Sequence, residues 1–376
     1  MAAAHSAPES RTFVADCAAL ATPEPAMSRS RSPASRTPDR RHRRANWFTP
    51  DTSFSLGRAA VDGGDPSKRP LSVAYLSARG DDVAVPDDAY AFLDCGDGRR
   101  LERFGSLLAD RPAPGAVGPR RATDRWAGAA VYHPGSGWWQ ADGSALTESA
   151  HPVAIDGLTI EARPAAGGQV GLFPEHVANG AWLASAVRSR FDAAEPAADR
   201  PEVLNLFAYT GLATLVAASA GARTVHVDAS RPAVAWARRN AELAGLAGKP
   251  IRWIVDDALD FVRREARRGR RYAGLVLDPP TYGHGGRGGR PAWQFDERIV
   301  ELLDACAGVA EPDAFWLLTT HTPGWEPDRL AMTLATATDA GVHEIDGLPL
   351  RLEAESGAVL RLGSAARFDP LRGERR

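Results

Sequence analysis

Hydrophobic and polar positions in the C-terminal half of the chain follow two alternating patterns. Short runs of apolar and β-branched residues predict buried strands, and longer amphipathic or apolar segments predict helices. The predicted strands are Val203–Phe207, Thr224–Val227, Ile251–Val255, Ala273–Leu277 and Ala314–Thr319. The predicted helices are Thr214–Ala220, Arg231–Gly245, Ala258–Arg268 and Ile299–Ala310.

The alternation of strands with helices predicts the topology of this half. Such an order forms βαβ units, whose right-handed crossovers produce a parallel sheet with helices on both faces. The expected fold class is therefore α/β, with a doubly wound, mostly parallel sheet of the Rossmann-like type. In these sheets ligands bind at the carboxyl ends of the strands, so the candidate site is expected there.

The N-terminal part of the chain has a different pattern, made of short strands and turns. Residues 1–68 are rich in Arg, Ser and Pro, which predicts a disordered tail. Within the next segment the predicted features are strands at Ala89–Leu93 and Leu158–Ala162, a turn at Cys95–Gly98 and a loop at Arg111–Arg121. The expected parts of the chain are this tail, a small β-rich N-terminal domain at 69–165 and the α/β domain at 166–376.

Two features of the N-terminal part have either a structural or an RNA-binding interpretation. Seven arginines between Arg29 and Arg44 are either solvated charges of the tail or an arm that binds RNA phosphates. Trp126, Trp138 and Trp139 either fill the core of the small domain or form an aromatic face that stacks on RNA bases. We prefer the structural interpretation for both features.

Composition argues against several other classes of protein. The formal net charge is −2, so no global field attracts the chain to nucleic acid. The three cysteines form no CxxC pair, which argues against a disulfide framework or a structural zinc site, and we expect no metal. Because no apolar run has the length of a membrane span and no secretory pattern is found, we expect a cytoplasmic protein without membrane contact.

The first predicted strand end carries a glycine in a tight turn, within the segment Asn205–Gly211. Gly211 lets a ligand approach the backbone, and the helix that follows offers its N-terminal amides. A dinucleotide site needs three glycines spaced GxGxxG, which this segment lacks. The turn therefore favours a cofactor without a pyrophosphate over NAD or FAD.

Acidic residues follow the next two predicted strands. Asp228 ends the second strand, where a carboxylate can accept hydrogen bonds from both ribose hydroxyls of an adenosine. Ser230 is the better candidate for the N-cap of the next helix. After the third strand, one of Asp256 and Asp257 can accept a hydrogen bond from the adenine amino group while the other caps a helix. We prefer Asp257 for adenine.

The fourth predicted strand ends in the segment Asp278-Pro279-Pro280-Thr281-Tyr282. The two prolines have no backbone N–H and fix an extended turn, which holds Asp278 at the sheet edge. The ring of Tyr282 can then lie beside a flat substrate. This turn suits a methyl transfer, in which catalysis is mainly the in-line placement of the acceptor. The predicted catalytic residues are Asp278, Pro279, Pro280 and Tyr282.

Together these segments resemble the class I S-adenosylmethionine-dependent methyltransferases, and within that class the group of bacterial large-subunit ribosomal RNA methyltransferases. The similarity runs from about Ala89 to Thr320 and includes Gly171–Glu175, which is similar to a segment of that group that closes over the cofactor. The resemblance implies S-adenosyl-L-methionine as cofactor and RNA as substrate. It also implies a set of residues around the cofactor: Phe173, Glu175, Asn205, Phe207, Tyr209, Gly211, Asp228, Asp257 and Asp278.

The sequence departs from the pattern of the group at two places. Relatives that methylate carbon 5 of cytosine need a cysteine nucleophile, but the loop Thr319–Pro323 has none and Cys306 falls in an apolar helix. The usual arginine after the upstream segment is missing from Glu175–Val177. We therefore expect methylation of a base heteroatom. His284 or His321 could accept a proton, but we prefer to interpret each as a loop residue without a catalytic role.

Arginine-rich segments near the predicted site also have two interpretations. The loop His284–Arg290 is either a mobile lid that contacts phosphate or a flexible connection. The arginines between Arg263 and Arg271 are interpreted as solvated charges, with RNA contact as the alternative. Two other functions stay open: methylation of a protein or small molecule, and a non-catalytic RNA-binding module on the same fold.

Overall fold

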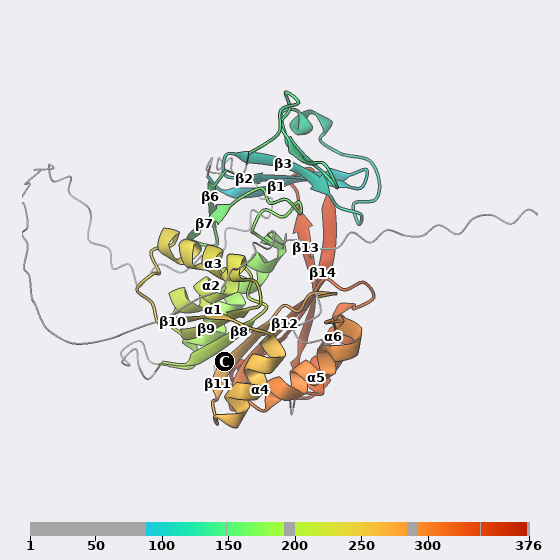
Figure 1. Ribbon diagram of the computed structural model, residues 1–376. Helices are drawn as coiled ribbons and strands as arrows, with labels where there is room; N and C mark the ends of the chain where they lie inside the picture. Colours follow the sequence, from blue (N-terminus) through green and yellow to red (C-terminus); the bar gives the residue numbers. More distant parts are fainter. Residues whose placement is uncertain (1–87, 148, 192–199, 284–291, 339, 374–376) are drawn as a thin grey trace, which may run out of the picture. The chain divides into compact units, whose positions relative to one another are not determined.

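The computed structural model describes residues 88–147, 149–191, 200–283, 292–338 and 340–373. Within these residues the largest sheet has seven strands in the order β10-β9-β8-β11-β12-β14-β13 (Figure 1). The strands are β8 (Glu202–Leu206), β9 (Arg223–Asp228), β10 (Ile251–Val255), β11 (Tyr272–Leu277), β12 (Ala310–Thr320), β13 (Asp346–Glu353) and β14 (Val359–Phe368). Strands β8 to β12 are parallel, and β14 is antiparallel to both β12 and β13. The predicted α/β fold with a mostly parallel sheet is confirmed.

Helices cover both faces of this sheet and form an apolar core on each (Figure 1). They are α1 (Gly180–Arg188), α2 (Leu212–Ala220), α3 (Arg231–Leu243), α4 (Ala258–Arg267), α5 (Phe295–Ala307) and α6 (Pro327–Ala335). Leu183 of α1 belongs to one core and Leu302 of α5 to the other. Consecutive residues of β11 divide in the same way, with Val276 in the first core and Leu277 in the second. Burial on both faces explains why the parallel strands are continuous apolar runs in the sequence.

The N-terminal region forms a five-stranded sheet in the order β1-β2-β3-β4-β5 and a separate hairpin of β6 and β7. The strands are β1 (Tyr90–Gly96), β2 (Arg99–Phe104), β3 (Leu107–Pro112), β4 (Ala130–His133), β5 (Gly137–Trp139), β6 (His151–Ile155) and β7 (Leu158–Ala162). Asp97 and Gly98, both with positive φ, make the turn between β1 and β2. This turn is shorter than predicted, because β1 continues through Gly96.

Strands β13 and β14 form a long hairpin that takes part in both regions (Figure 1). Near its open end, Phe368 to Ser364 of β14 pair with β12 in the large sheet. Toward its other end, Leu352 and Leu360 pack with Phe92 of β1 in a separate apolar cluster. The hairpin therefore contributes to the large sheet and to a core that it shares with the N-terminal sheet.

Several sequence predictions in the N-terminal region were wrong in part. Arg111 belongs to β3 and not to a loop, because its guanidinium is buried and donates to Glu102 Oε2 (Nε to Oε2 3.0 Å). Trp126 and Trp138 are buried as predicted. Trp139 is 37% exposed and does not fill a core.

Other predictions concern helices or lie outside the described residues. Helix α5 begins at Phe295 and not at Ile299, because Asp296 and Glu297 fill its first turn, where acids interact favourably with the helix dipole. The sequence analysis did not predict α1, α6 or the β13–β14 hairpin.

The tail at 1–68 and the loop His284–Arg290 lie outside the described residues. The division between 69–165 and 166–376 stays a prediction. In the described part of the chain, no helix has both the length and the apolar character that a membrane span requires.

Candidate functional site

The carboxyl ends of four parallel strands, β8 to β11, meet at one edge of the large sheet (Figure 1). Leu206 of β8 is in register with Leu277 of β11. Just beyond this pair, the backbone N–H of Asp278 donates to the carbonyl of Leu206 (3.4 Å). On the other side of β8, the N–H of Asp256 donates to the carbonyl of Asp228 (3.1 Å). The acids that end these strands therefore share one edge of the sheet.

A cavity opens at this edge, between the loop after β8, the segment before α1 and the start of α2. The predicted site residues in its lining are Phe173, Asn205, Phe207, Tyr209, Gly211 and Asp278. The predicted site residues outside this lining are Glu175, Asp228, Asp257, Pro279, Pro280 and Tyr282. The structure thus brings together six of the residues that the resemblance places around the cofactor. The residues assigned to ribose and adenine lie at the neighbouring strand ends.

The loop after β8 contains two left-handed residues that are not glycine. Phe207 has φ 55° and Tyr209 has φ 48°. Such a conformation costs about 1–3 kcal/mol and persists only where the surrounding structure fixes it, typically at functional sites. Gly211, with φ 92°, is the third left-handed residue of the loop, and a Cβ there would lie 3.1 Å from the Cβ of Ala237 in α3. The loop therefore has a fixed, strained shape around the cavity.

Hydrogen bonds from three other segments hold this loop. Asp228 Oδ2 accepts from the backbone N–H of Tyr209 (2.8 Å). Thr210 Oγ1 donates to the carbonyl of Gly171 (2.6 Å), and Asn240 Nδ2 donates to the carbonyl of Thr210 (2.9 Å). Strand β9, the segment before α1 and helix α3 each supply one of these contacts, which together offset the backbone strain.

Asp228 is fixed at the end of β9 by two backbone donors. Its Oδ1 accepts from the N–H of Ser230 (2.8 Å), in addition to the bond from Tyr209 to Oδ2. Burial raises the pKa of Asp228 above its ordinary value, and these two hydrogen bonds oppose that shift. Each carboxylate oxygen can accept more than one hydrogen bond, so Asp228 retains acceptor capacity for ribose hydroxyls. Ser230 caps α3 by accepting from the N–H of Ala233 (3.3 Å), which confirms that prediction.

Asp256 and Asp257 divide their roles differently from the prediction. Asp257 is the N-cap of α4, where its Oδ1 accepts from the N–H of Asp260 (3.0 Å). Asp256 instead forms an ion pair with Arg264 and accepts from the N–H of Asp257 (2.9 Å). The capping role belongs to the residue directly before the first helical turn, so its assignment to Asp256 was wrong. Asp257 is exposed at the sheet edge, and its role at adenine stays a prediction.

The segment before α1 packs on the loop after β8 and on α3. Gly171, with φ 79°, lies against the ring of Trp236, and a Cβ there would be 2.1 Å from that ring. Pro174 then starts the short helix η3 (Pro174–Asn179). This path brings the ring of Phe173 to 5.4 Å from that of Tyr209, between ring centres. Phe173 therefore reaches the cavity, whereas Glu175 is buried outside its lining.

Asp278 is held by two side chains beside the cavity. Thr319 Oγ1 donates to Asp278 Oδ1 (2.6 Å), and His176 Nε2 lies 3.3 Å from Asp278 Oδ2. Burial raises the pKa of Asp278. His176, and then His321 and Thr319, lower it by more than burial raises it, so the net pKa is below the ordinary value. Burial lowers the pKa of His176, and Asp278 reverses this to a net increase. Asp278 is therefore an ionised carboxylate at the cavity.

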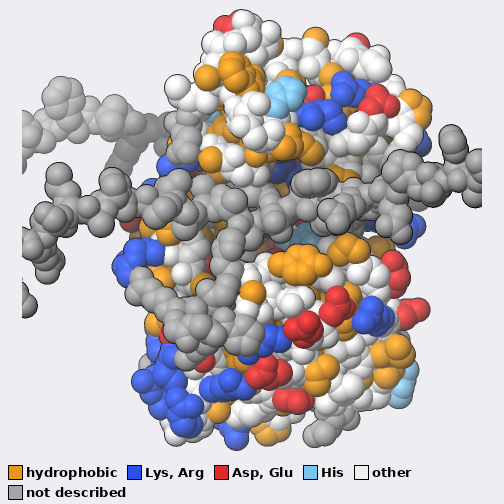
Figure 2. All heavy atoms as spheres, turned by 45° about the vertical axis from the view of Figure 1, so that its right-hand side comes forward, with side chains coloured by type: hydrophobic (Ala, Val, Ile, Leu, Met, Phe, Trp, Pro, Cys, Tyr) orange, Lys and Arg blue, Asp and Glu red, His pale blue; other side chains and the backbone are white. Residues whose placement is uncertain are grey.

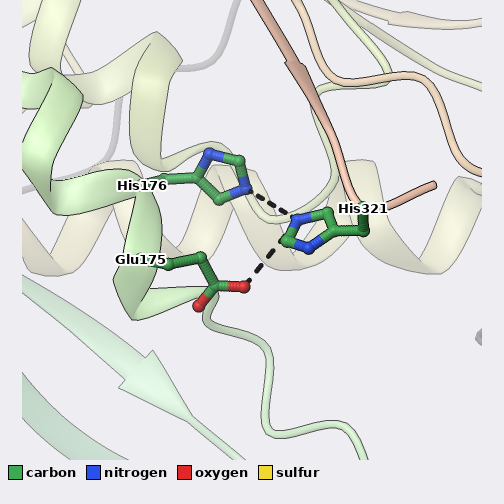
Figure 3. Close-up of side chains that lie close together, drawn as sticks. All are labelled: Glu175, His176 and His321. Carbon is green, nitrogen blue, oxygen red and sulfur yellow. Dashed lines mark hydrogen bonds and ion pairs between the residues drawn. The ribbon is translucent and has the colours of Figure 1, made fainter. Parts of the chain in front are cut away.

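His321 joins this group from the loop after β12 (Figure 3). Its Nε2 lies 3.3 Å from His176 Nε2 and 3.7 Å from Glu175 Oε1. Its Nδ1 lies 2.9 Å from the carbonyl oxygen of Leu362. Because a carbonyl only accepts hydrogen bonds, Nδ1 donates to Leu362, and Nε2 faces His176 and Glu175. The sequence analysis named His321 and Glu175 but not His176, and its other candidate proton acceptor, His284, lies outside the described residues.

The turn after β11 is surrounded by aromatic side chains. Tyr282 is 53% exposed and forms an isolated β-bridge with Gln294. Trp293 Nε1 donates to the carbonyl of Pro280 (2.6 Å), and the ring of Trp293 lies 5.3 Å from that of Phe207. The turn is thereby tied to the loop after β8, and the ring of Tyr282 is accessible to solvent beside it.

Sequence reasoning missed several polar residues around the cavity. Asp156, in the β6–β7 turn, lines the cavity, and burial raises its pKa. His226 Nδ1 lies 3.0 Å from Thr214 Oγ1, which accepts from Asn205 Nδ2 (2.9 Å). Burial lowers the pKa of His226 to about 3, so the ring is neutral. A histidine within an apolar strand run indicates a buried polar partner, whereas Asp156 gives only an ordinary turn signal.

The fold and the site define a class of protein. A doubly wound sheet with acids at successive strand ends, and without a GxGxxG fingerprint, is the arrangement of the class I S-adenosylmethionine-dependent methyltransferases. A crystal structure of the S-adenosylmethionine-dependent methyltransferase from Agrobacterium tumefaciens is 34% identical, covers 75% of this chain and 90% of that one, and superposes with a TM-score of 0.67. The chain therefore belongs to the S-adenosylmethionine-dependent methyltransferases, and S-adenosylmethionine is its cofactor.

Two further comparisons concern part of the chain and its fold. The family model described as "Conserved hypothetical protein 95" matches residues 184–286. A putative S-adenosylmethionine-dependent methyltransferase from Streptococcus mutans shares the fold, with a TM-score of 0.58, 15% identity and 76% coverage of each chain.

Curated relatives named "Ribosomal RNA large subunit methyltransferase K/L" are similar over part of the chain. The protein of Methylococcus capsulatus is 34% identical over 139 residues, which is 36% of this chain and 18% of that protein. The protein of Magnetococcus marinus is 30% identical over 195 residues, which is 51% of this chain and 24% of that protein. The chain thus spans less than a quarter of the length of these relatives, and the predicted resemblance to this group is confirmed over the aligned region.

The residues of the site fit the cofactor. Gly211 leaves the backbone open beside the cavity, and Asp228 has acceptor capacity at the next strand end. The buried cavity is lined mainly by apolar side chains, which suits the uncharged stem of a methionine. When bound, the cofactor supplies a methyl group activated by a sulfonium. The chain itself has to place an acceptor atom in line with that group.

Proposed function

We propose that this protein transfers a methyl group from S-adenosylmethionine to a base heteroatom of RNA, with large-subunit ribosomal RNA as the substrate. The observation that carries the proposal is the ionised carboxylate of Asp278, which Thr319 fixes at the cavity four residues before the exposed Tyr282. The names of the curated relatives support the choice of ribosomal RNA.

In this proposal the strand ends share the work of binding and placement. Asp228 accepts hydrogen bonds from the ribose of the cofactor and Asp257 accepts one from its adenine, while the loop after β8 surrounds its methionine part. Asp278 accepts a hydrogen bond from an N–H of the target base. That bond would orient the nitrogen lone pair toward the methyl group that the cofactor supplies. The nitrogen would take the methyl group as its bond to sulfur breaks and then lose its N–H proton to Asp278 or to water, which requires no strong base.

The described cysteines do not support the alternative carbon-5 chemistry. A cytosine carbon-5 methyltransferase needs a thiolate within reach of carbon 6. Cys95 and Cys306 are both buried, and neither lines the cavity. Burial also raises the pKa of the Cys306 thiol far above its ordinary value. Methylation of a nitrogen or an oxygen requires no such nucleophile.

The exposed aromatic side chain of Tyr282 supports RNA as the substrate more than the surface charges do. Tyr282 offers a flat face beside the turn that holds Asp278, and bases stack on such faces. The arginines around the end of α4 are largely paired instead: Arg263 with Glu301, Arg268 with Glu265, and Arg270 with Glu202. Figure 2 likewise shows acidic and basic side chains next to one another on the lower part of the visible face.

A methylation assay tests this function. Purified full-length protein is incubated with tritium-labelled S-adenosylmethionine and large-subunit ribosomal RNA from a strain that lacks the gene. The label is expected in one RNA nucleoside, which mass spectrometry identifies and which is absent from the deletion strain. Label in protein or in a small molecule, with none in RNA, would overturn the proposed substrate.

A further inference from the structure

Three side chains at the cavity form a cluster, of which His176 also contacts Asp278 (Figure 3). Glu175 and His176 are consecutive residues of η3, and His321 comes from the loop after β12. One ligand atom of each lies within 4.8 Å of the others. The nearest two, Nε2 of His176 and Nε2 of His321, are 3.3 Å apart.

Hydrogen bonds alone do not satisfy all the polar atoms of this cluster. His321 Nδ1 donates to the carbonyl of Leu362, and its Nε2 lies 3.3 Å from Nε2 of His176. Only one N–H of His176 points this way, and Asp278 Oδ2 also lies 3.3 Å from the same Nε2. Glu175 is 2% exposed, and its Oε2 has no hydrogen-bond partner among the described residues. A buried carboxylate without a partner is unfavourable unless a positive charge lies nearby.

The spacing of these atoms fits a small divalent cation. Ligand nitrogens about 2.0–2.1 Å from a tetrahedral zinc ion are about 3.3 Å from each other. The observed separation of the two Nε2 atoms is 3.3 Å. The 3.7 Å between His321 Nε2 and Glu175 Oε1 is slightly longer, so a tetrahedral site would require the carboxylate to move a few tenths of an ångström closer. Two histidines and one glutamate are a zinc ligand set that leaves one position open.

The hydrogen bond of His321 is also typical of a metal ligand. A histidine that binds a metal usually donates its second ring N–H to a carbonyl or a carboxylate, which fixes both the ring and its tautomer. The bond from His321 Nδ1 to the Leu362 carbonyl (2.9 Å) has this form, and Leu362 belongs to β14 of the large sheet. The ring is thus oriented by a rigid element, with Nε2 directed at the other two side chains (Figure 3).

We propose that Glu175, His176 and His321 bind one divalent first-row metal ion, for which zinc is the best match. The sequence analysis expected no metal because the cysteines form no CxxC pair, and it did not consider these two histidines, which are 145 positions apart. The ion would replace the missing donor at Glu175 and hold η3 to the loop after β12. The site does not depend on the proposed RNA substrate.

Cobalt binding tests the site without any methylation assay. Full-length protein is treated with a chelator, exchanged into metal-free buffer and titrated with Co²⁺. Visible absorption bands of a cobalt ion with nitrogen and oxygen ligands are expected to saturate at one equivalent and to disappear when Zn²⁺ is added. The variants His321→Ala, His321→Gln and Glu175→Gln are expected to weaken this binding by at least about tenfold.

The control is His133→Ala, which removes an exposed histidine of β4 outside the cluster and is expected to bind like the wild type. Circular dichroism shows whether each variant is folded, and His321→Gln keeps much of the side-chain volume if the alanine variant is not. No stoichiometric cobalt band in the wild type, or equal binding by wild type and folded cluster variants, would overturn the proposal.

Discussion

The carboxylate of Asp228 accepts a hydrogen bond from the backbone N–H of Tyr209 at 2.8 Å, and Tyr209 has the left-handed φ of 48°. One side chain at the end of β9 therefore stabilises the strained loop after β8. The same carboxylate is the candidate acceptor for the cofactor ribose, so loop shape and cofactor binding are expected to depend on each other.

The first prediction concerns Asp228. Asp228→Asn is expected to weaken S-adenosylmethionine binding by about tenfold to a hundredfold, because hydrogen bonds to a charged group contribute about 1.5–3 kcal/mol. Isothermal titration calorimetry with the purified protein measures this change. The control is Asp304→Asn, which alters an exposed acid of α5 away from the cavity and is expected to leave the affinity unchanged. Equal affinities for all three proteins would contradict the ribose assignment.

The second prediction separates catalysis from cofactor binding. Asp278→Asn removes the charge that we assign to the placement of the acceptor, but it keeps the shape of the side chain. The turnover number is expected to fall by about a hundredfold or more, the lower range for a positioned acid or base, while cofactor affinity changes little. Single-turnover transfer of tritium from labelled cofactor to RNA measures the rate. An Asp278→Asn protein as fast as the wild type would refute the role of Asp278.

The third prediction concerns Tyr282 and RNA. Tyr282→Ala is expected to weaken RNA binding by about 1–3 kcal/mol, the range for loss of one base-stacking side chain, while Tyr282→Phe retains the affinity. Fluorescence anisotropy with a labelled ribosomal RNA fragment, at one fixed salt concentration, measures the effect. If the alanine and phenylalanine variants bind equally well, the ring of Tyr282 does not contact a base.

The fourth prediction concerns stability at Gly171. A Cβ at this position would lie 2.1 Å from the ring of Trp236, and the backbone has φ 79°. Gly171→Ala is therefore expected to lower the free energy of unfolding by the left-handed backbone cost of about 1 kcal/mol plus an overpacking cost of about 1–3 kcal/mol. Gly269→Ala is the matched control, since Gly269 has φ 66° with nothing within 4 Å of its Cβ position. Urea unfolding should show a clearly larger loss for Gly171→Ala.

The fifth prediction is a pH dependence from the N-terminal sheet. Burial raises the pKa of Asp94, but hydrogen bonds from Trp126 Nε1 (2.9 Å) and the N–H groups of Ala122 (2.8 Å) and Arg121 (3.0 Å) lower it below the ordinary value. A lowered folded-state pKa adds stability above the unfolded pKa of about 3.9, and this stability is lost as the pH falls through the folded-state pKa.

Two variants test this dependence on acid. Urea unfolding between pH 6 and about 3 is expected to show a smaller loss of stability for Asp94→Asn than for the wild type, because asparagine does not titrate. Trp126→Phe removes one donor and is expected to give an intermediate dependence. Identical pH profiles for wild type and Asp94→Asn would show that Asp94 titrates alike in the folded and unfolded states.

The five parallel strands of the large sheet could be predicted from the sequence because each depends on a local pattern of residues. Parallel strands buried on both faces are continuous apolar runs, and the helices between them end in recognisable signals such as Gly221, which has φ 112°. The acids that follow these runs could also be found, because they lie directly after each strand. Asp228 and Asp278 were located in this way.

The rest of the site depends on tertiary contacts that no local pattern encodes. Asp156 reaches the cavity from the β6–β7 turn. His321, in the loop after β12, contacts His176 although the two are 145 positions apart in the sequence. The β13–β14 hairpin was missed because Gly347 and Pro349 interrupt its apolar alternation, and both are unfavourable within strands. The helix-capping role of Asp257 shows a related limit, since a carboxylate before a helix has more than one local use.

The long β13–β14 hairpin also affects the order in which parts of the protein can fold during synthesis. Leu352 and Leu360 complete the apolar cluster around Phe92, although about 250 residues of chain are translated between them. The N-terminal strands therefore leave the ribosome early but lack their last buried neighbours until β13 and β14 have been made. Nascent chains that stall before residue 346 would present Phe92 to solvent or to a chaperone.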